Sequence, residues 1–452
     1  MTDKNMQMAQ SVAQAVAAQG GRVYYVGGLV RDRLLGRENK DVDIEVHGVT
    51  PEALEAILDG LGERTEMGAS FGVYGLRHFD LDIAMPRKEK ATGRGHKDFA
   101  VFTDPFLGTQ KAAMRRDFTI NAMMEDVLTG EIVDHFGGQE DLRQGVIRHV
   151  NDVTFAEDPL RVLRAAQFAA RFAFSVAPET TALCSTMDLT ALASERIFGE
   201  MEKALLKAPR PSIFFEFLRQ AHQLHHWFPE VQALIGVPQE PKHHPEGDVW
   251  NHTMLVLDQA AQLREQAKEP LCLMLSALCH DLGKTQTTAV MDGVIRSLGH
   301  ETAGLPLAER FLARLTSETR LHKVVLNMIE LHMRPNALHK QSAGWKAMNR
   351  LYDASVCPED LLLLAKADSL GREIDEPYAP TEEFLRAHLM QYHEMMARPY
   401  VKGADLVAEG IMPGKDFGKA LAHAHKLRLS GVKKEDALRQ TIAFLKKERA
   451  GS

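Results

Sequence analysis

The sequence predicts an α+β protein of several domains, in which a small head of mixed strands and helices precedes a long helical part. Strand-like and helix-like segments alternate up to about Val150, whereas helical periodicity dominates from Phe155 onward. A turn-rich stretch at 237–248 interrupts the helical part. At about 150 residues per domain, a chain of 452 residues exceeds one domain. We therefore expect four parts: a head (1–150), a helical neck (151–236), a histidine-rich helical domain (237–370) and a helical tail (371–452).

The composition is typical of a globular protein, with 45% hydrophobic and 25% charged residues. No stretch approaches the roughly 18 apolar residues of a transmembrane helix, so no membrane partner is expected. Residues 1–20 lack the apolar segment of a secretory signal, which favours a cytosolic protein. The absence of a C-x-x-C pair predicts reduced, buried thiols at all four cysteines: Cys184, Cys272, Cys279 and Cys357.

The charge balance limits how the chain could bind nucleic acid. A net charge of −7 argues against a protein that coats nucleic acid non-specifically, so such a partner must meet a local basic patch. The segment 87–116, with eight basic and three acidic residues, is one candidate. A solvated loop is the alternative explanation of the same residues.

Within the head, β-branched and aromatic runs predict strands, and apolar residues at helical spacing predict helices. The expected strands are 23–26, 41–46, 72–76, 79–85 and 131–133. The expected helices are 29–35, 51–61 and 118–124. From Phe155 to the end the chain is expected to be all-helical, with Asp158 and Pro159 at the start of one helix.

A glycine turn and paired carboxylates indicate phosphoryl chemistry in the head. Gly27 and Gly28 separate a strand from a helix, so backbone N–H groups can approach an anion such as phosphate. Asp41 and Asp43 are two residues apart on a strand and therefore share one face, where both can bind divalent cations. A lone D-x-D also fits an exposed strand face, but Arg31 after the glycine turn favours the metal site.

Several motifs resemble the class II tRNA nucleotidyltransferase and bacterial poly(A) polymerase family. They include G-G-L-V-R-D-R-L-L-G-R at 27–37, K-D-V-D-I at 40–44 and R-R-D-F-T-I-N-A at 115–122. The similarity continues through the segments 134–138, 157–161 and 194–197. The resemblance implies a polymerase β-like nucleotidyltransferase head with a mixed sheet, followed by an all-α neck and body.

The resemblance also implies roles for individual residues. Asp41 and Asp43 correspond to the family's Mg²⁺ ligands, and Asp82 to its third catalytic carboxylate. The residues expected to bind the nucleotide are Gly27, Gly28, Arg31, Arg116, Asp117 and Asn121. The implied partners are tRNA, CTP and ATP.

In this family an E-D-x-x-R segment acts as a protein template, which selects the base by hydrogen bonds. Asp158, Arg161 and Arg164 correspond to that segment and to the same helix face. The competing interpretation of Asp158 is a helix N-cap ahead of Pro159.

A second group of residues predicts a metal site in the histidine-rich domain. His252, His280, Asp281 and Asp368 resemble the H…HD…D pattern of the HD phosphohydrolase superfamily, whose helices converge on a divalent cation. Imidazoles and carboxylates together suit a first-row transition metal or Mg²⁺, so the metal is left open. Either hydrolysis of RNA ends or a structural, RNA-positioning role fits such a domain.

Other histidines nearby have less defined roles. His300 and His332 could complete a fuller metal site. The remaining pairs fit loop or surface residues: His225 with His226, and His243 with His244.

The preferred function is addition of the 3′-terminal CCA of tRNA from CTP and ATP. A poly(A) polymerase, or an enzyme that adds only CC or only A, shares the same head motifs. The basic loop 87–98 resembles the loop that accompanies the switch from C to A addition, and it argues against CC addition alone. The alternative of another class is an HD phosphohydrolase with a non-catalytic nucleotide- or RNA-binding head.

Overall fold

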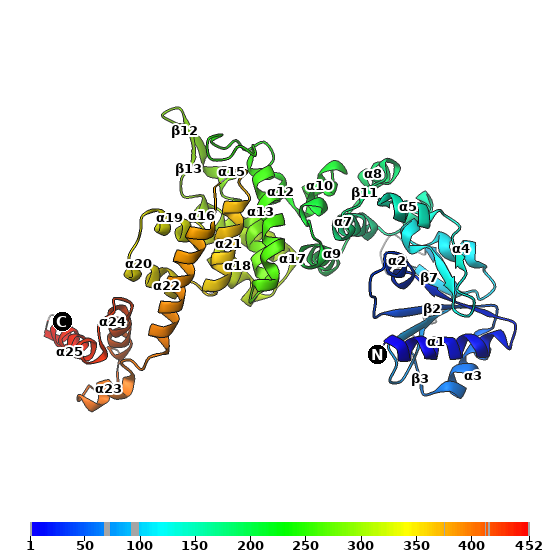
Figure 1. Ribbon diagram of the computed structural model, residues 1–452, viewed down its shortest axis with the longest axis horizontal. Coiled ribbons are helices and arrows are strands. Elements are labelled where there is room, and N and C mark those ends of the chain that lie inside the picture. The colour runs from blue at the N-terminus through cyan, green and yellow to red at the C-terminus, as the bar shows by residue number, and fades with distance from the viewer. Residues whose placement is uncertain are drawn as a thin grey trace. The chain divides into compact units, whose positions relative to one another are not determined.

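The computed structural model describes residues 2–66, 73–91, 99–374, 376–411, 413–414 and 416–450. It divides into two compact units, Met1–Trp227 and Phe228–Ser452, and each is described by itself (Figure 1). The centre of the predicted loop, 92–98 with Gly93 and Gly95, lies outside the described residues.

The first unit contains a mixed seven-stranded sheet in the order β3-β4-β5-β2-β1-β8-β9. β2 pairs with β5 in parallel and with β1 antiparallel, and β1 pairs antiparallel with β8. This confirms the mixed sheet expected for the head. The strands are β1 (Arg22–Val26), β2 (Val42–His47), β3 (Arg64–Glu66), β4 (Val73–Leu76), β5 (Leu81–Ala84), β8 (Met124–Asp126) and β9 (Ile132–Val133).

Helices cover this sheet and connect its strands. α1 (Thr2–Ala17) packs against β1, β2 and α3 through a buried apolar stripe that includes Val12 and Val16. α3 begins at Pro51 after the N-cap Thr50, whose side chain accepts a hydrogen bond from the backbone of Ala53. The other head helices are α2 (Gly28–Leu34), α3 (Pro51–Leu61), α4 (Thr109–Met114), η1 (Thr119–Asn121) and α5 (Gly138–Gln144).

The predicted helix 118–124 is wrong. The structure has a single 3₁₀ turn there, η1, and Met124 already belongs to strand β8. Side chains on all sides of this segment are buried, so the hydrophobic pattern does not show which secondary structure it adopts. The backbone groups of β8 form their hydrogen bonds with β1 instead of within a helix. The hairpin of β6 (Arg87–Ala91) and β7 (Phe99–Thr103) was not expected from the sequence either.

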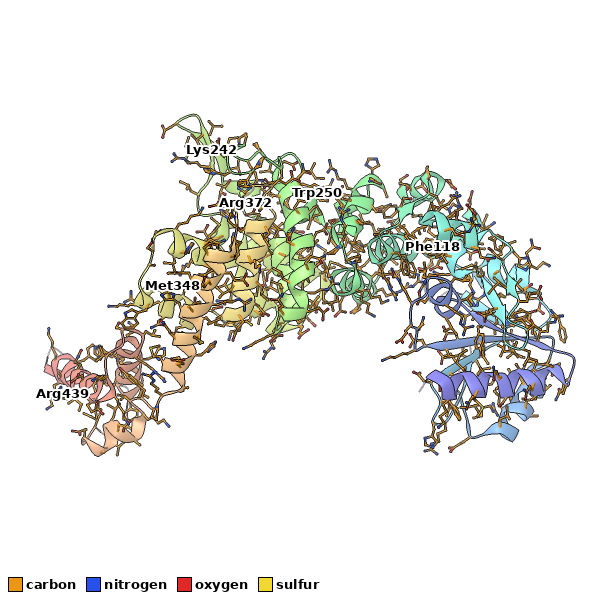
Figure 2. All side chains as sticks on the ribbon, in the orientation of Figure 1. Phe118, Lys242, Trp250, Met348, Arg372 and Arg439 are labelled. Atoms are coloured by element: carbon orange, nitrogen blue, oxygen red, sulfur yellow. The ribbon has the colours of Figure 1, made fainter. Side chains whose placement is uncertain are left out.

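The helical neck packs around α7 (Leu160–Phe172), which contacts α9 and α10. Phe118 of the head, labelled in Figure 2, meets Phe155 and Phe168 edge to face, so head and neck share one apolar core. The neck elements are α6 (Asp152–Ala156), α7, α8 (Pro178–Ser185), α9 (Ser194–Lys207), α10 (Ser212–Gln220) and α11 (Leu224–Trp227). A short parallel pair joins β10 (Val146–Ile147) to β11 (Ser175–Val176).

The second unit is built around α14 (Pro270–Cys279), which is apolar on every side and packs against α13, α18 and α21. Its other helices begin with α12 (Pro229–Gln232), α13 (Val249–Leu263), η2 (Arg264–Gln266), α15 (Lys284–Thr287), α16 (His300–Ala303), α17 (Leu305–Leu315) and α18 (Thr319–Leu331). They continue with α19 (Arg334–Lys340), α20 (Trp345–Ala354), α21 (Pro358–Leu370), α22 (Ala379–Ala397), α23 (Gly403–Ala408), α24 (Phe417–Leu429) and α25 (Lys434–Ala450).

The expectation that everything after Phe155 is helical is wrong at β11 and at a second place in the HD region. β12 (Thr288–Met291) and β13 (Val294–Ser297) form an antiparallel hairpin. Asp292 and Gly293 both have positive φ, at 52° and 75°, as a tight two-residue hairpin turn requires. An Asp-Gly pair between β-branched residues was therefore the signal that could have predicted this hairpin.

All four cysteines are free and buried, in agreement with the prediction. Burial raises the pKa of the Cys184 and Cys272 thiols to about 12, which keeps them protonated and unreactive. Among the helices described, none combines the length and apolar character that a membrane span needs.

Candidate functional site

A cavity of about 690 Å³ in the first unit gathers almost all the residues predicted for the head and neck. It is lined by Gly27, Gly28, Arg31, Asp41, Asp43, Arg116, Asp117, Asn121, Asp158, Arg161 and Arg164. Its lining also includes Asp32, Asn39, Arg87, Arg115, Phe168, Arg171, Arg196 and Lys207. Nine basic side chains face five acidic ones, so the cavity attracts a polyanion although the whole chain is acidic.

The carboxylates of the cavity come from neighbouring parallel strands. Asp43 of β2 is in register with Asp82 of β5, and Asp41 directly precedes β2. Asp82 is exposed and lies beside the cavity rather than in its lining. Burial, together with the negative charges of Asp82 and Asp41, raises the pKa of Asp43 despite the opposing charge of Arg116. Crowded carboxylates of this kind are suited to share divalent cations.

Arg31 lines the cavity, and its guanidinium is oriented by Asp32 and Asn121. It is buried and contacts Asp32 (Nη2 to Oδ1, 2.7 Å), and it donates from Nη1 to Asn121 (2.6 Å). Asn39 donates to the other oxygen of Asp32 and accepts from the backbone N–H of Asp41. This chain of contacts links the helix after the glycine turn to the strand that carries the carboxylates. Asp32 and Asn39 were missed because single polar residues in a loop or helix give no periodic signal.

Asp117 connects the head to the neck. Its Oδ1 accepts from the backbone of Phe118 and the side chain of Asn121, while its Oδ2 accepts from Arg164 at 2.7 Å. Burial alone would raise its pKa, but the Arg164 guanidinium and these hydrogen bonds hold the pKa of Asp117 below its usual value. Asp117 is therefore ionised and fixes the orientation of two other cavity residues.

Arg116 has a buried counter-ion that the sequence did not indicate as functional. Glu45 is 1% exposed, lies 3.4 Å from Arg116 and accepts a hydrogen bond from His47 at 2.8 Å. Although burial opposes ionisation, His47 and Arg116 lower the pKa of Glu45 to about 2. Gly27 has φ of 68°, and a Cβ there would lie 3.3 Å from the Arg116 guanidinium. Glycine thus permits both the turn and the close approach of this arginine.

The side chains proposed to select the base already form hydrogen bonds or ion pairs with other groups of the protein. Asp158 accepts from the backbone of Leu160 and pairs with Arg196 at 3.1 Å, so it performs the capping contact as well as facing the cavity. Arg161 donates to the backbone carbonyls of Thr154 and Arg115. These contacts fix the two side chains on the cavity wall. The pairing of Asp158 with Arg196 of α9 had no signal in the sequence.

The second unit brings together all four predicted metal ligands. His252 Nε2 lies 3.1 Å from Asp368 Oδ1 and 3.6 Å from Asp281 Oδ2, and His280 Nε2 lies 3.1 Å from the same Asp281 oxygen. His300 and His332 join them, with His300 Nε2 at 3.3 Å from Asp281 Oδ1. His252, His280 and His332 are completely buried, and His300 is buried with 6% of its surface exposed.

In three histidines of this cluster, the ring nitrogen Nδ1 forms a hydrogen bond with the protein backbone. His280, His300 and His332 donate from Nδ1 to the backbone carbonyls of Ala277, Ser297 and Ile329. Their Nε2 atoms therefore carry lone pairs that point into the cluster. His280 Nε2 is buried and has no hydrogen-bond partner in the structure, as expected for an atom that binds a cation.

A cavity of about 340 Å³ opens onto this cluster. Its wall includes Arg296 of the β12–β13 hairpin, together with Lys284, Lys340 and Arg372. Four cations beside a metal-binding cluster suit a phosphate-bearing ligand. His244, expected as a loop or surface residue, does lie in a loop but contacts the cluster through Glu246, which accepts from both His244 and His252.

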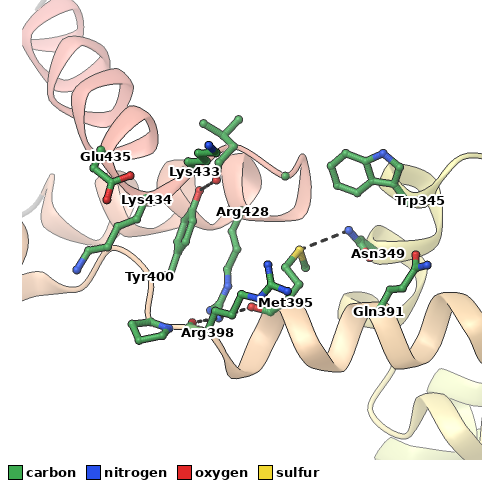
Figure 3. A pocket seen from close by; sticks show the side chains of 13 residues that line it. Trp345, Asn349, Gln391, Met395, Arg398, Tyr400, Arg428, Lys433, Lys434 and Glu435 are labelled. Carbon is green, nitrogen blue, oxygen red and sulfur yellow. Dashed lines mark hydrogen bonds between the residues drawn. The ribbon is translucent and has the colours of Figure 1, made fainter.

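A third cavity, of about 450 Å³, is lined mostly by residues of the tail, for which the sequence predicted no chemistry, and also by Trp345 and Asn349 (Figure 3). Arg428 donates to the carbonyls of Met395, Met396 and Arg398 at the C-terminal end of α22. Tyr400 donates to the carbonyl of Val432. These contacts attach the last helices to α22 on one side of the cavity.

Family models match three segments of the chain. The model described as the poly A polymerase head domain matches residues 23–148, and the HD domain matches 249–373. A probable RNA and SrmB-binding site of polymerase A matches 173–235. Two of the matches correspond to the regions that contain the head cavity and the metal cluster.

Curated relatives are similar over most of their length. The multifunctional CCA protein of Halorhodospira halophila is 38% identical over 426 residues, which is 92% of this chain and 98% of that protein. The multifunctional CCA protein of Chromobacterium violaceum is 40% identical over 390 residues, which is 81% of this chain and 89% of that protein.

Solved structures share the fold at lower identity. A CCA-adding enzyme in complex with ATP has a TM-score of 0.68 at 21% identity, over 98% of this chain and 94% of that one. The Bacillus stearothermophilus CCA-adding enzyme in complex with CTP has a TM-score of 0.65 at 22% identity, over 99% of both chains. The predicted α+β, multi-domain fold is thereby confirmed. The chain belongs to the family of the multifunctional CCA proteins, which are nucleotidyltransferases with a poly A polymerase head and an HD domain.

Proposed function

We propose that the chain is a CCA tRNA nucleotidyltransferase, which adds CMP, CMP and AMP from CTP and ATP to the 3′ end of tRNA. The observation that carries this proposal is the single basic cavity in which the glycine turn, the carboxylates and the neck residues meet. The names of the curated relatives, and of solved structures with ATP, CTP and tRNA, support the same substrates.

In the proposed reaction, the 3′-hydroxyl oxygen of the RNA forms a bond to the α-phosphorus of the nucleotide. The bond between that phosphorus and the α–β bridging oxygen breaks, pyrophosphate leaves, and the hydroxyl proton passes to solvent. Asp41, Asp43 and Asp82 are the residues that would hold Mg²⁺. Bound there, the metal would neutralise charge on the triphosphate and on the attacking oxygen.

The other cavity residues position the nucleotide. Gly27 and Gly28 let backbone N–H groups approach the phosphates at the start of α2. Arg31 and Arg116 supply fixed positive charge, and each is oriented by a buried carboxylate, Asp32 or Glu45. Because these contacts exist before substrate binds, little ordering is required when the triphosphate arrives.

Base selection is assigned to Asp158, Arg161 and Arg164. They line the cavity from the neck, together with the head groups that are proposed to bind the phosphates. Arg164 is linked to the head through Asp117, so movement of the neck helix would be transmitted to the sugar and phosphate contacts. A bidentate contact to a base edge contributes roughly 1–3 kcal/mol of discrimination.

The test is incorporation of each labelled nucleotide into tRNA transcripts that end before CCA, after C, and after CC. Ordered addition of C, C and A followed by arrest is expected. Addition of A only after CC, or open-ended A tracts, would instead indicate a partial CCA enzyme or a poly(A) polymerase. Asp41→Asn should abolish incorporation, whereas Asp59→Asn, an exposed acidic residue of the same unit, should not.

A second activity is proposed for the HD cluster, namely hydrolysis of phosphate esters at RNA ends. The cations Lys284, Arg296 and Arg372 beside the buried ligands favour it over a purely structural role. His252, His280, Asp281 and Asp368 are the residues that would hold the divalent metal. If hydrolysis at the HD cluster were the main activity and the head only bound nucleotide or RNA, Asp41→Asn would leave the turnover of every substrate unchanged. The predicted cytosolic location stays a prediction.

A further inference from the structure

The cavity of about 450 Å³ that is lined by residues of α20, α22, α24 and α25 combines an aromatic ring, amide groups and cations (Figure 3). A cavity of this size can hold one small ligand. Its charged lining residues are four basic side chains and one acidic one, namely Arg398, Arg428, Lys433, Lys434 and Glu435. The head cavity and the HD cavity are lined by other residues. This cavity is therefore distinct from both candidate sites, and its charge favours an anion.

Trp345 provides an aromatic surface on one side of the cavity. It is 45% exposed, whereas Trp227 and Trp250, the other two tryptophans of the chain, are 8% and 0% exposed. The edge of its ring packs against Gly431, where a Cβ would lie only 2.0 Å from the indole. Glycine at this position therefore allows the ring to be fixed while much of its surface stays open. Such a ring is suited to stack on a planar aromatic ligand.

Asn349 brings a buried hydrogen-bond acceptor to the wall of the same cavity. It is 4% exposed, and its Nδ2 donates to the carbonyl of Leu429 at 3.2 Å and contacts Met395 Sδ at 3.5 Å. Among the residues that the structure describes, none donates a hydrogen bond to its Oδ1. A buried amide oxygen without a donor is unfavourable, so a ligand that offers an N–H group here is favoured.

Two cations of the lining have side chains without a partner in the described part of the chain, Arg398 and Lys433. In contrast, Lys434 pairs with Asp405 at 2.8 Å, and Arg428 donates to backbone carbonyls. A terminal phosphate carries a charge of about −2 at neutral pH, whereas a phosphate within an RNA chain carries a single negative charge. Two unpaired cations therefore match a terminal phosphate better than an internal one, which favours a free nucleotide over RNA.

The aromatic and cationic groups lie in different parts of the cavity. In Figure 3, Trp345 lies apart from Tyr400 and Lys433, with Met395 and Arg428 between them. A nucleotide has the same division, with a flat base at one end and a charged phosphate at the other. The arrangement therefore matches a nucleotide better than an inorganic anion, which would make no use of the ring.

We propose that this cavity binds one free nucleotide that has a terminal phosphate and a base with an exocyclic amino group, as in the monophosphates of adenosine and cytidine. The base stacks on Trp345 and donates from its amino group to Asn349 Oδ1. Arg398 and Lys433 bind the phosphate. The site is separate from the nucleotide site of the head, and it does not depend on the proposed addition of CCA or on the HD metal.

The direct test is a titration of the full chain with AMP, followed by tryptophan fluorescence. Because Trp345 is the exposed tryptophan, we expect saturable quenching, which should be lost in Trp345→Phe. Purine riboside 5′-monophosphate differs from AMP only by lacking the amino group, and adenosine lacks the phosphate. Each should bind about 10-fold more weakly than AMP, because each loses one polar contact in the cavity. Comparison of these ligands tests the contact of buried Asn349 without a variant that could unfold α20.

Variants of the two unpaired cations test the phosphate contact. Arg398→Gln and Lys433→Gln should each weaken AMP binding about 10-fold and leave adenosine binding unchanged, because adenosine has no phosphate. Both side chains are exposed, so neither change should disturb folding. The matched control is Arg350→Gln, an exposed arginine of α20 that does not line the cavity. It should bind AMP as the parent chain does.

Four outcomes would overturn the inference. Absence of saturable quenching by AMP would refute a nucleotide site at Trp345. Equal AMP affinity in the parent chain and in both cation variants would refute the phosphate contact, and equal affinity for AMP and purine riboside 5′-monophosphate would refute the contact with Asn349. Quenching by tRNA but not by AMP would show that this surface contacts RNA instead of a free nucleotide. Nucleotide incorporation at the head is measured separately and would be unaffected by any of these results.

Discussion

The head cavity and the HD cluster both gather side chains of the kinds that bind divalent cations, but they differ in burial and in ligand type. In the head, partly buried Asp43 lines a cavity of about 690 Å³, and exposed Asp82 lies beside that cavity. In the HD domain, His252, His280 and Asp281 are almost completely excluded from solvent. Carboxylates at an open wall suit Mg²⁺ that arrives with a nucleotide, whereas buried imidazoles suit a resident transition metal. We therefore expect the head to bind an exchangeable metal ion and the HD domain to retain its own.

The largest expected effect is the loss of nucleotide incorporation at the head site. Asp43→Asn should lower nucleotide incorporation about 10³-fold, because metal binding at the reacting phosphate contributes several kcal/mol. Single-turnover incorporation of labelled CMP measures it. Hydrolysis at the HD site of the same preparation should be unchanged. A comparable loss of both activities would contradict the independence of the two sites.

Removal of metal should distinguish the two sites, because we expect the metal of the head to exchange faster than the metal of the HD site. After gel filtration without chelator, incorporation should require added Mg²⁺, while the HD site should retain its metal. Chelator should then remove the HD metal and lower the midpoint of thermal unfolding, because an ion that binds only the folded state stabilises it. Elemental analysis and scanning calorimetry measure these changes. Complete loss of metal on gel filtration alone would argue against a resident ion.

Asp117→Ala tests how strongly the neck is coupled to the head. Arg164 and Asn121 would lose their acceptor, which should destabilise the first unit by about 1–3 kcal/mol and reduce kcat/KM for both nucleotides about 10²-fold. Denaturant unfolding and steady-state kinetics measure the two effects. Asp188→Ala, an exposed neck residue, is the matched control. Normal kinetics in Asp117→Ala would show that the link through Arg164 is only structural.

The smallest effect is expected for the counter-ion of Arg116. Glu45→Gln keeps the shape of the side chain but removes its charge, so Arg116 should be less well oriented. We expect KM for the nucleotide to rise about 5- to 10-fold with little change in kcat, because the contact acts mainly on binding. A fall in kcat at constant KM would place Glu45 in the chemical step instead.

Most of the residues that the structure brings together in the two candidate sites were predicted from the sequence, but few of the contacts that orient them were. Asp41, Asp43 and His280 stand in short motifs whose spacing is itself the signal. Asp32 and Glu45 are isolated acidic residues, and only the fold shows that each faces an arginine. The helix expected at 118–124 failed because burial on every side removed the periodicity on which such predictions rest.

The final helices are attached to the rest of the unit by hydrogen bonds and by one buried side chain, Leu429 of α24, and this limits their local stability. Leu406, Ile411, Ala420 and Leu445 form a small apolar cluster of their own. The guanidinium of Arg428 donates hydrogen bonds to the backbone carbonyls at the end of α22, which makes Arg428 a polar link between this cluster and the rest of the unit. Water can replace such hydrogen bonds at modest cost. Amide protons of α23 to α25 should therefore exchange together, through an opening that leaves α14 and its neighbours folded.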